Sequence, residues 1–362
     1  MAFQLKNLLE LSKLATKHNA SDIHLRSSEA PVLRISNSLV PVQTPPLSFD
    51  DILDICSILL DTPREQITAD SVNERDGACE IEGLCRFRFN IFRYTDNIGI
   101  VMRIINTKIP SLESLGFSPI IQQIADTERG LVLVTGATGS GKSTTLAAMI
   151  DYINSTKAYH VVTLEDPVEY LHKQKKSRIT QRDMGVDSTS FSTALRSLLR
   201  QDPDVILIGE MRDPETVEIA LKAAETGHLV FSTLHTTNAT NTIGRILSMF
   251  EGENKQEIRK RLSETLKATI GQRMLESKRN KIIIAQEVMT MTPNVRDVIL
   301  GSEPLSKLNG IIEKGYEEGG TGRSQSFDQH IFELLKKKQI TEEEALKNAD
   351  NESNLQQQLL VE

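Results

Sequence analysis

The run GATGSGKS at 136–143 has the glycine, lysine and serine spacing of a phosphate-binding loop. It follows the apolar run LVLVT at 131–135 and precedes the helical pattern STTLAAMIDYI, which is the strand, loop and helix context that this motif requires. Glycines let backbone N–H groups close around phosphate oxygens, and the helix N-terminus adds positive charge. We therefore expect the phosphates of ATP to contact Gly136, Ala137, Thr138, Gly139, Ser140, Gly141, Lys142, Ser143 and Thr144.

Within this loop, Lys142 should reach the β- and γ-phosphates, and Ser143 should bind Mg²⁺ with Thr144 beside it. A glycine-rich turn without a ligand explains two fixed glycines followed by Lys-Ser poorly. The motif predicts nucleotide binding, whereas hydrolysis needs further residues.

Three carboxylates follow the next apolar run, in TLEDPVEYLH at 163–172. Glu165, Asp166 and Glu169 would stand at the end of a strand, where loops line the ligand crevice of an α/β sheet. Such a group can position and activate a water molecule beside a magnesium ion. Taken alone, the same residues could be solvated loop charges with a helix-capping Asp.

A further acid ends the apolar run in DPDVILIGEMRD at 202–213. Glu210 fits the magnesium-supporting acid of a Walker B strand, binding the metal directly or through water, although Gly209 stands where many such enzymes carry Asp. An apolar strand followed by an acid is common by chance. The assignment of Glu210 to the metal therefore depends on the neighbouring motifs.

Two histidines bracket the run TGHLVFSTLHTTNA at 226–239. His228 and His235 stand at the two ends of a predicted strand, and a histidine in a strand is more often a core or interface residue. Because this strand should end near the γ-phosphate, we expect a sensing role.

The elements around these motifs predict an α/β fold. The apolar runs 131–135, 160–164, 204–209 and 228–235 alternate with helical patterns, which is typical of a mostly parallel sheet covered on both faces. Residues 1–108 mix strand and helix patterns and suggest a small α+β domain. We expect a linker at 109–129, the ATPase domain at 130–290 and a helical region at 291–362, with a loop at 317–326 and a polar tail from Asp350.

The composition of the chain argues against several classes of function. The 362 residues carry a net charge of −7, which makes a general nucleic-acid footprint unlikely. The cysteines, Cys56, Cys79 and Cys85, form no metal-ligand or CxxC pattern and fit a reducing cytoplasm. No apolar run approaches the ~20 residues that span a bilayer, so we expect no membrane insertion.

The order of motifs, GATGSGKST, EDPVE, ILIGEMRDPET and ETGHLVFSTLHTTNA, resembles the secretion ATPase superfamily and, within it, the PilT and PilU group of type IV pilus retraction ATPases. ASDIHLRSSEAPVLRI at 20–35 resembles the start of that group's PAS-like N-terminal domain. The resemblance implies a RecA-like core, ATP hydrolysis and a homohexameric ring.

The resemblance also implies roles for individual residues. Glu169 would be the catalytic base, with Glu165 and Asp166 shaping the magnesium and water network, and Glu210 would be the Walker B acid. His228 and His235 would link nucleotide state to the neighbouring subunit. In RFRFNIFRYTDNIGIVMR, Arg88 and Arg103 resemble arginines that reach a nucleotide on another subunit, although exposed strand arginines are usually solvated.

One departure concerns the retraction role. Where the group's retraction enzymes often carry AIRNL, this chain has NVRDV at 294–298, and its ending SFDQHIFELLKKKQITEEEALKNADNESNL is similar to the PilU type, an accessory motor. The implied partners are an inner-membrane pilus platform protein and a PilT paralogue, at the cytoplasmic face of the membrane.

Three alternatives stay open. A pilus assembly or type II secretion ATPase would normally bring a longer N-terminal region and a four-cysteine zinc module. A nucleotide-gated scaffold would show little turnover. A helicase is supported only by local basic runs such as HKQKKSR at 172–178.

Overall fold

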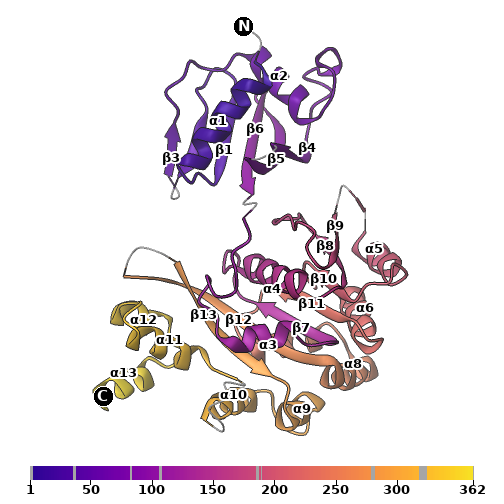
Figure 1. Ribbon diagram of the computed structural model, residues 1–362, viewed down its shortest axis with the longest axis vertical. Coiled ribbons are helices and arrows are strands. Elements are labelled where there is room, and N and C mark those ends of the chain that lie inside the picture. The colour runs from indigo at the N-terminus through magenta and orange to yellow at the C-terminus, as the bar shows by residue number, and fades with distance from the viewer. Residues whose placement is uncertain are drawn as a thin grey trace. The chain divides into compact units, whose positions relative to one another are not determined.

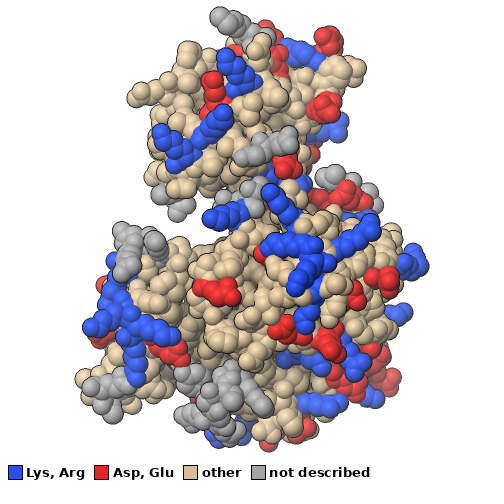
Figure 2. Space-filling view, in the orientation of Figure 1, with Lys and Arg blue, Asp and Glu red and all other residues tan. Residues whose placement is uncertain are grey.

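The computed structural model describes residues 3–35, 38–81, 84–105, 108–184, 187–188, 190–278, 282–317 and 324–361. The chain divides into two compact units, residues 1–108 and 109–362, each of which is described by itself. Both units combine sheets with helices, as Figure 1 shows, and the predicted α/β class is confirmed. Figure 2 shows that, on the face in view, each unit carries charged side chains of both signs separated by uncharged residues.

The first unit is a six-stranded antiparallel sheet with strand order β3-β2-β1-β6-β5-β4. Its strands are β1 (Asp22–Arg26), β2 (Val32–Ile35), β3 (Ser38–Pro41), β4 (Arg75–Ile81), β5 (Cys85–Tyr94) and β6 (Asn97–Ile105). Buried Phe87, Phe89 and Ile91 alternate with partly exposed residues along β5, because successive side chains point to opposite faces. They share a core with helices α1 (Leu5–Lys17) and α2 (Phe49–Leu59); a 3₁₀ turn, η1, covers Arg64–Gln66.

The second unit contains a seven-stranded sheet with strand order β13-β12-β7-β11-β10-β8-β9. Its strands are β7 (Gly130–Thr135), β8 (His160–Glu165), β9 (Arg178–Asp183), β10 (Val205–Ile208), β11 (Leu229–Leu234), β12 (Leu266–Glu276) and β13 (Ile282–Thr290). All neighbouring pairs are parallel except β12 with β13. Every side chain of β7 and β11 is buried, as expected for central strands covered on both faces.

Helices cover both faces of this sheet. One core joins the sheet to α5 (Phe191–Leu198), α6 (Pro214–Glu225), α7 (Ala239–Ser248), α8 (Gly252–Thr265), α9 (Pro293–Leu300) and α10 (Lys307–Glu317). The other joins it to α3 (Pro119–Ala125) and α4 (Lys142–Thr156). Ile120, Ile121 and Ile124 of α3 are buried in that core, so the segment 109–129, which we expected to be a linker, is packed into the second unit.

A further helical group packs on β12 and β13. It comprises α11 (Phe327–Lys336), α12 (Glu342–Asn348) and α13 (Glu352–Val361), and its core includes Phe327, Ile331 and Leu355. The segment after Asp350, expected to be a polar tail, is mostly exposed and forms helix α13, in which Leu355 is buried. The Asp328 carboxylate accepts from Asp350 N and Asn351 N just before this helix. Most of the expected loop at 317–326 lies outside the described residues.

Candidate functional site

The parallel strands bring the predicted motifs to one edge of the sheet. Strands β7, β8, β10 and β11 run in the same direction, so the segments that follow their carboxyl ends meet there. A cavity of about 360 Å³ lies among these segments. Its lining includes Lys142, Glu169, Glu210 and His235, which come from four separate motifs.

Two glycines explain the tight path of the phosphate loop between β7 and α4. Gly136 has φ 147°, and a Cβ there would lie 2.4 Å from Ser140 Oγ and 2.6 Å from the backbone oxygen of Gln272. Gly141, the residue before α4, has φ 90°. L-residues rarely adopt such positive φ angles, so the loop needs glycine for both conformation and space. The loop residues 138–144 line the cavity.

Lys142, the first residue of α4, is buried, and its side chain reaches back to the start of the loop. Its ammonium donates to the carbonyl oxygens of Gly136 and Ala137, each at 2.9 Å, and burial lowers its pKa while nearby Glu169 opposes that shift. An ammonium group has three donors, so one remains for a phosphate oxygen.

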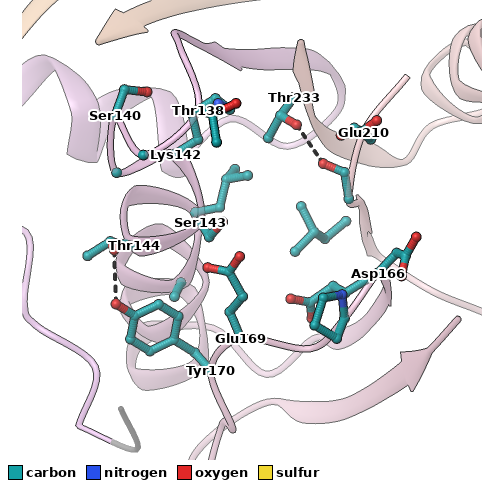
Figure 3. A pocket seen from close by; sticks show the side chains of 18 of the residues that line it. Thr138, Ser140, Lys142, Ser143, Thr144, Asp166, Glu169, Tyr170, Glu210 and Thr233 are labelled. Atoms are coloured by element: carbon teal, nitrogen blue, oxygen red, sulfur yellow. Dashed lines mark hydrogen bonds between the residues drawn. The ribbon is translucent and has the colours of Figure 1, made fainter. Parts of the chain in front are cut away.

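The carboxylates after β8 have different surroundings. Figure 3 shows the Glu169 side chain pointing into the cavity toward Ser143, with Asp166 across from it. Glu165 accepts hydrogen bonds from Thr163 Oγ1 at 2.7 Å and Gln181 Nε2 at 3.2 Å. Burial raises the pKa of Glu165 to about 7, whereas those two hydrogen bonds lower it. Glu165 is therefore held by its own strand and its neighbour.

Glu210 follows β10 and is fixed from two sides. It forms an ion pair with Arg212 and a hydrogen bond with Nε2 of His235, the latter at 3.1 Å. A carboxylate only accepts, so Nε2 of His235 carries the hydrogen. A Cβ at Gly209 would lie 3.1 Å from the backbone oxygen of Leu164, so a larger residue at this position would be crowded by the end of β8.

The two histidines are separated by the strand. His235 lines the cavity, and burial and the positive charges of Lys142 and Arg212 lower its pKa. His228 precedes β11 at the opposite end, where Nδ1 lies 2.9 Å from the backbone oxygen of Ala223 and 3.2 Å from Thr226 Oγ1. Within this chain His235 therefore lines the cavity and His228 does not, and the sensing role expected of the two histidines stays a prediction.

Arg88 and Arg103 lie in the first unit. They are directly opposite each other on β5 and β6. The Nε of Arg103 donates to Asp22 Oδ1 at 2.9 Å, although the Arg103 side chain is 71% exposed. Their predicted approach to a nucleotide of another subunit stays a prediction.

Several contacts in and beside the cavity could not be predicted from the sequence. The hydroxyl oxygen of Tyr170 lies 2.9 Å from Thr144 Oγ1. Thr233 Oγ1 donates to the Gly209 carbonyl at 2.7 Å. Both dashed contacts are visible in Figure 3. Gln272 of β12 donates to Thr145 Oγ1 at 2.6 Å across 127 positions of sequence. Only folding brings these pairs together.

Comparison with known proteins identifies the family to which this chain belongs. The family described as Type II/IV secretion system protein matches residues 4–359. The chain is 41% identical to the type IV pilus retraction ATPase PilT of Pseudomonas aeruginosa, over 95% of this chain and 98% of that protein. It is 36% identical to the type IV pilus ATPase PilU of the same organism, over 96% and 89%.

A solved structure of a related protein has the same fold. The crystal structure of the pilus retraction motor PilT with bound ADP is 38% identical and superimposes with a TM-score of 0.86, covering 97% of this chain and 99% of that one. No helix in the described part of the chain is both long and apolar enough to cross a membrane.

Proposed function

Because the chain belongs to the Type II/IV secretion system protein family, we propose that it is an ATP-hydrolysing motor of type IV pilus retraction. One observation carries the proposal: Lys142, Glu169 and Glu210, which come from three separate strand ends, line one cavity of about 360 Å³. Phosphate, metal and attacking water all need groups of these types within one site.

The phosphates would bind at the N-terminal turn of α4. Loop N–H groups surround them, and the remaining N–H of Lys142 reaches a β- or γ-oxygen. The helix N-terminus adds positive charge at the same place. Transferring the phosphoryl group to water then requires an oriented nucleophile and stabilised charge.

The residues present fit Mg²⁺. The Ser143 hydroxyl and the Glu210 carboxylate both line the cavity, and the described residues include no cluster of three acidic, histidine or cysteine side chains that could hold a metal alone. Mg²⁺ keeps several waters and is usually held by one or two protein oxygens together with phosphate oxygens. When bound, the ion would neutralise charge on the β- and γ-oxygens.

Glu169 is our choice for the base that orients and deprotonates water. Its carboxylate points into the cavity, whereas Glu165 is occupied by Thr163 and Gln181. Glu165 and Asp166 would then shape the magnesium and water network beside it. Glu210, held by Arg212 and His235, supports the metal through water or directly.

The proposal extends to assembly. We place the chain in a homohexamer at the cytoplasmic face of the membrane, acting on an inner-membrane pilus platform protein, with a PilT paralogue as a further partner only in the accessory, PilU-type role. Arg88 and Arg103 would reach the nucleotide of a neighbouring subunit. Identity is higher to PilT than to PilU, 41% against 36%, which favours an independent retraction role over the accessory one.

Phosphate release by the purified chain tests the enzymatic part. Wild type should hydrolyse ATP, Lys142→Ala should lose nucleotide binding, and Glu169→Gln should bind nucleotide while losing at least ~100-fold in turnover, since general base catalysis contributes about 10²- to 10⁴-fold. Wild type without turnover in any assembly state would favour a scaffold. Deletion and complementation, with and without a PilT paralogue, tests the retraction part.

A further inference from the structure

The loop between β11 and α7 contacts the candidate site at two points. Residues 235–238 form this loop, which we call the β11–α7 loop. Its first residue, His235, contacts Glu210, and Thr237 lines a cavity of about 320 Å³ together with residues 137–140 of the phosphate loop. Strand β11 is paired on both sides in the sheet, so the start of the β11–α7 loop is fixed. Its orientation then depends on what holds its other end.

A carboxylate from a distant strand holds that other end. Glu287 of β13 is 4% exposed, and its Oε1 accepts from the backbone N–H of Ala239 at 2.6 Å. Ala239 is the first residue of α7, directly after the N-cap Asn238. The first N–H groups of a helix have no partner within the helix, and the N-terminal end of a helix favours negative charge. The contact joins residues 48 positions apart and ties the end of the β11–α7 loop to β13.

Glu287 stands where the C-terminal helices pack on the sheet. It lies opposite Gly271 of β12, where an added Cβ would be 3.1 Å from the Phe327 ring and 3.5 Å from the Glu287 Cβ. The guanidinium carbon of Arg273 lies 3.9 Å from the centre of the same ring, and Arg273 Nη2 donates to Asp350 Oδ1 at 2.6 Å. Glu287 therefore connects the β11–α7 loop with the part of the sheet that α11 covers.

We infer that Glu287 is a positioning residue of the ATPase site, which holds the N–H of Ala239 and thereby keeps the β11–α7 loop where His235 meets Glu210. The inference rests on the proposed function, because it gives Glu210 the role of supporting Mg²⁺ during hydrolysis. Glu287 is not among the residues that line the 360 Å³ cavity, so it acts on turnover through His235. The competing interpretation is that Glu287 only stabilises the fold.

Two variants remove the contact from opposite sides. Glu287→Leu deletes the acceptor, and Ala239→Pro deletes the donor at the first helical position, where proline is tolerated. Each should lower kcat for ATP hydrolysis about 10-fold, the lower end of the effect of removing an outer partner of a metal-supporting group, and leave the Kd for ATP within about 3-fold. Glu287→Gln keeps a carbonyl acceptor of similar size and should hold kcat within about 3-fold of wild type.

Combination with His235→Ala separates positioning from general stability. If Glu287 acts through His235, adding Glu287→Leu or Ala239→Pro to His235→Ala should change kcat by less than about 2-fold, because the residues share one effect. Thr292→Ala is the matched control, since Thr292 caps α9 by accepting from Val295 N at 3.3 Å and is not among the cavity-lining residues. Losing this cap lowers stability and should leave kcat within about 2-fold of wild type.

The outcomes distinguish this inference from the function on which it rests. A kcat near wild type in both contact-deleting variants would overturn the inference, and so would an undiminished loss in the His235→Ala background or equal losses in Glu287→Gln and Glu287→Leu. If Glu287→Leu does not fold, Ala239→Pro decides by the first two criteria. ATP turnover by wild type would leave the proposed function standing in all these cases, whereas wild type without turnover would overturn both.

Discussion

Nε2 of His235 lies 3.1 Å from Oε2 of Glu210, and this contact joins the carboxyl ends of β11 and β10 beside the phosphate loop. The same carboxylate pairs with Arg212. Glu210 is therefore held from both sides, and its orientation depends on the loop after β11. A shift of that loop would move the acid that we assign to the metal.

His235→Ala should lower kcat about 10- to 100-fold, because removing a residue that orients a metal-supporting group usually has an effect of that size. ATP affinity should change much less. Steady-state phosphate release and nucleotide binding measure the two quantities. His228→Ala is the matched control, since His228 contacts Ala223 and Thr226 at the other end of β11. Equal losses of kcat in both variants would contradict the role given to the His235–Glu210 pair.

Arg88 and Arg103 should matter to turnover more than to binding. If they stabilise charge on a neighbouring subunit's nucleotide, each alanine variant should lose roughly 10³-fold or more in kcat of the assembled protein while its Kd for ATP changes little. Arg93→Ala is the control, because Arg93 also lies on β5 but pairs with Asp70 at 3.2 Å. Full turnover in both single variants would rule out the trans role.

Glu287 should make stability depend on pH. It is buried, accepts from Ala239 N at 2.6 Å, and has its pKa raised to about 7 by burial and by Asp350, with Arg273 opposing. The folded state therefore binds the proton more tightly than an unfolded glutamate, whose pKa is 4.5. This stabilisation is complete below pH ~4.5 and is lost as pH rises through ~7.

Glu287→Gln should flatten this dependence, reducing the fall in unfolding free energy between pH 5 and 8 by on the order of 1 to 3 kcal/mol. Calorimetric Tm values at the two pH values measure it. Glu165 has a pKa raised to about 7 as well, so part of the wild-type slope should persist. The exposed Glu253→Gln should leave the slope unchanged, and an unchanged slope in Glu287→Gln would refute the assignment.

The hydrogen bond from Gln272 to Thr145 should be measurable as a coupling. Gln272 is 1% exposed and Thr145 is 0% exposed. When one of them is replaced by an apolar residue, the other stays buried and loses this hydrogen bond. Gln272→Leu and Thr145→Val should each cost about 1 to 3 kcal/mol, and the double variant should cost roughly 1 kcal/mol less than their sum. Urea unfolding of the four proteins gives the coupling energy. A strictly additive result would show that the contact contributes nothing.

Local sequence was sufficient for much of the fold and site. The phosphate loop, the four parallel strands and the acids after β8 and β10 are readable because each depends on glycine placement, on apolar runs or on a position directly after a strand. In the first unit, strand β5 is readable from the alternation of its residues, whereas its antiparallel pairing is not.

Other features could not be read in this way. Helix α3 was hidden in a segment rich in turn residues, since burial of its isoleucines against α4 and the sheet decides its structure. The packing of helix α13 could not be read either, because it depends on one buried leucine and on the Asp328 carboxylate, which folding brings together.

The sequence by itself determined that a phosphate loop and a group of acids follow parallel strands, because that chemistry is encoded in contiguous residues. Only the tertiary structure decided that His235 and not His228 lines the cavity and that Gln272 donates to Thr145. The reason is physical: strand direction, strand order and burial are properties of the packed chain, and contacts between residues 25 to 127 positions apart leave no local pattern.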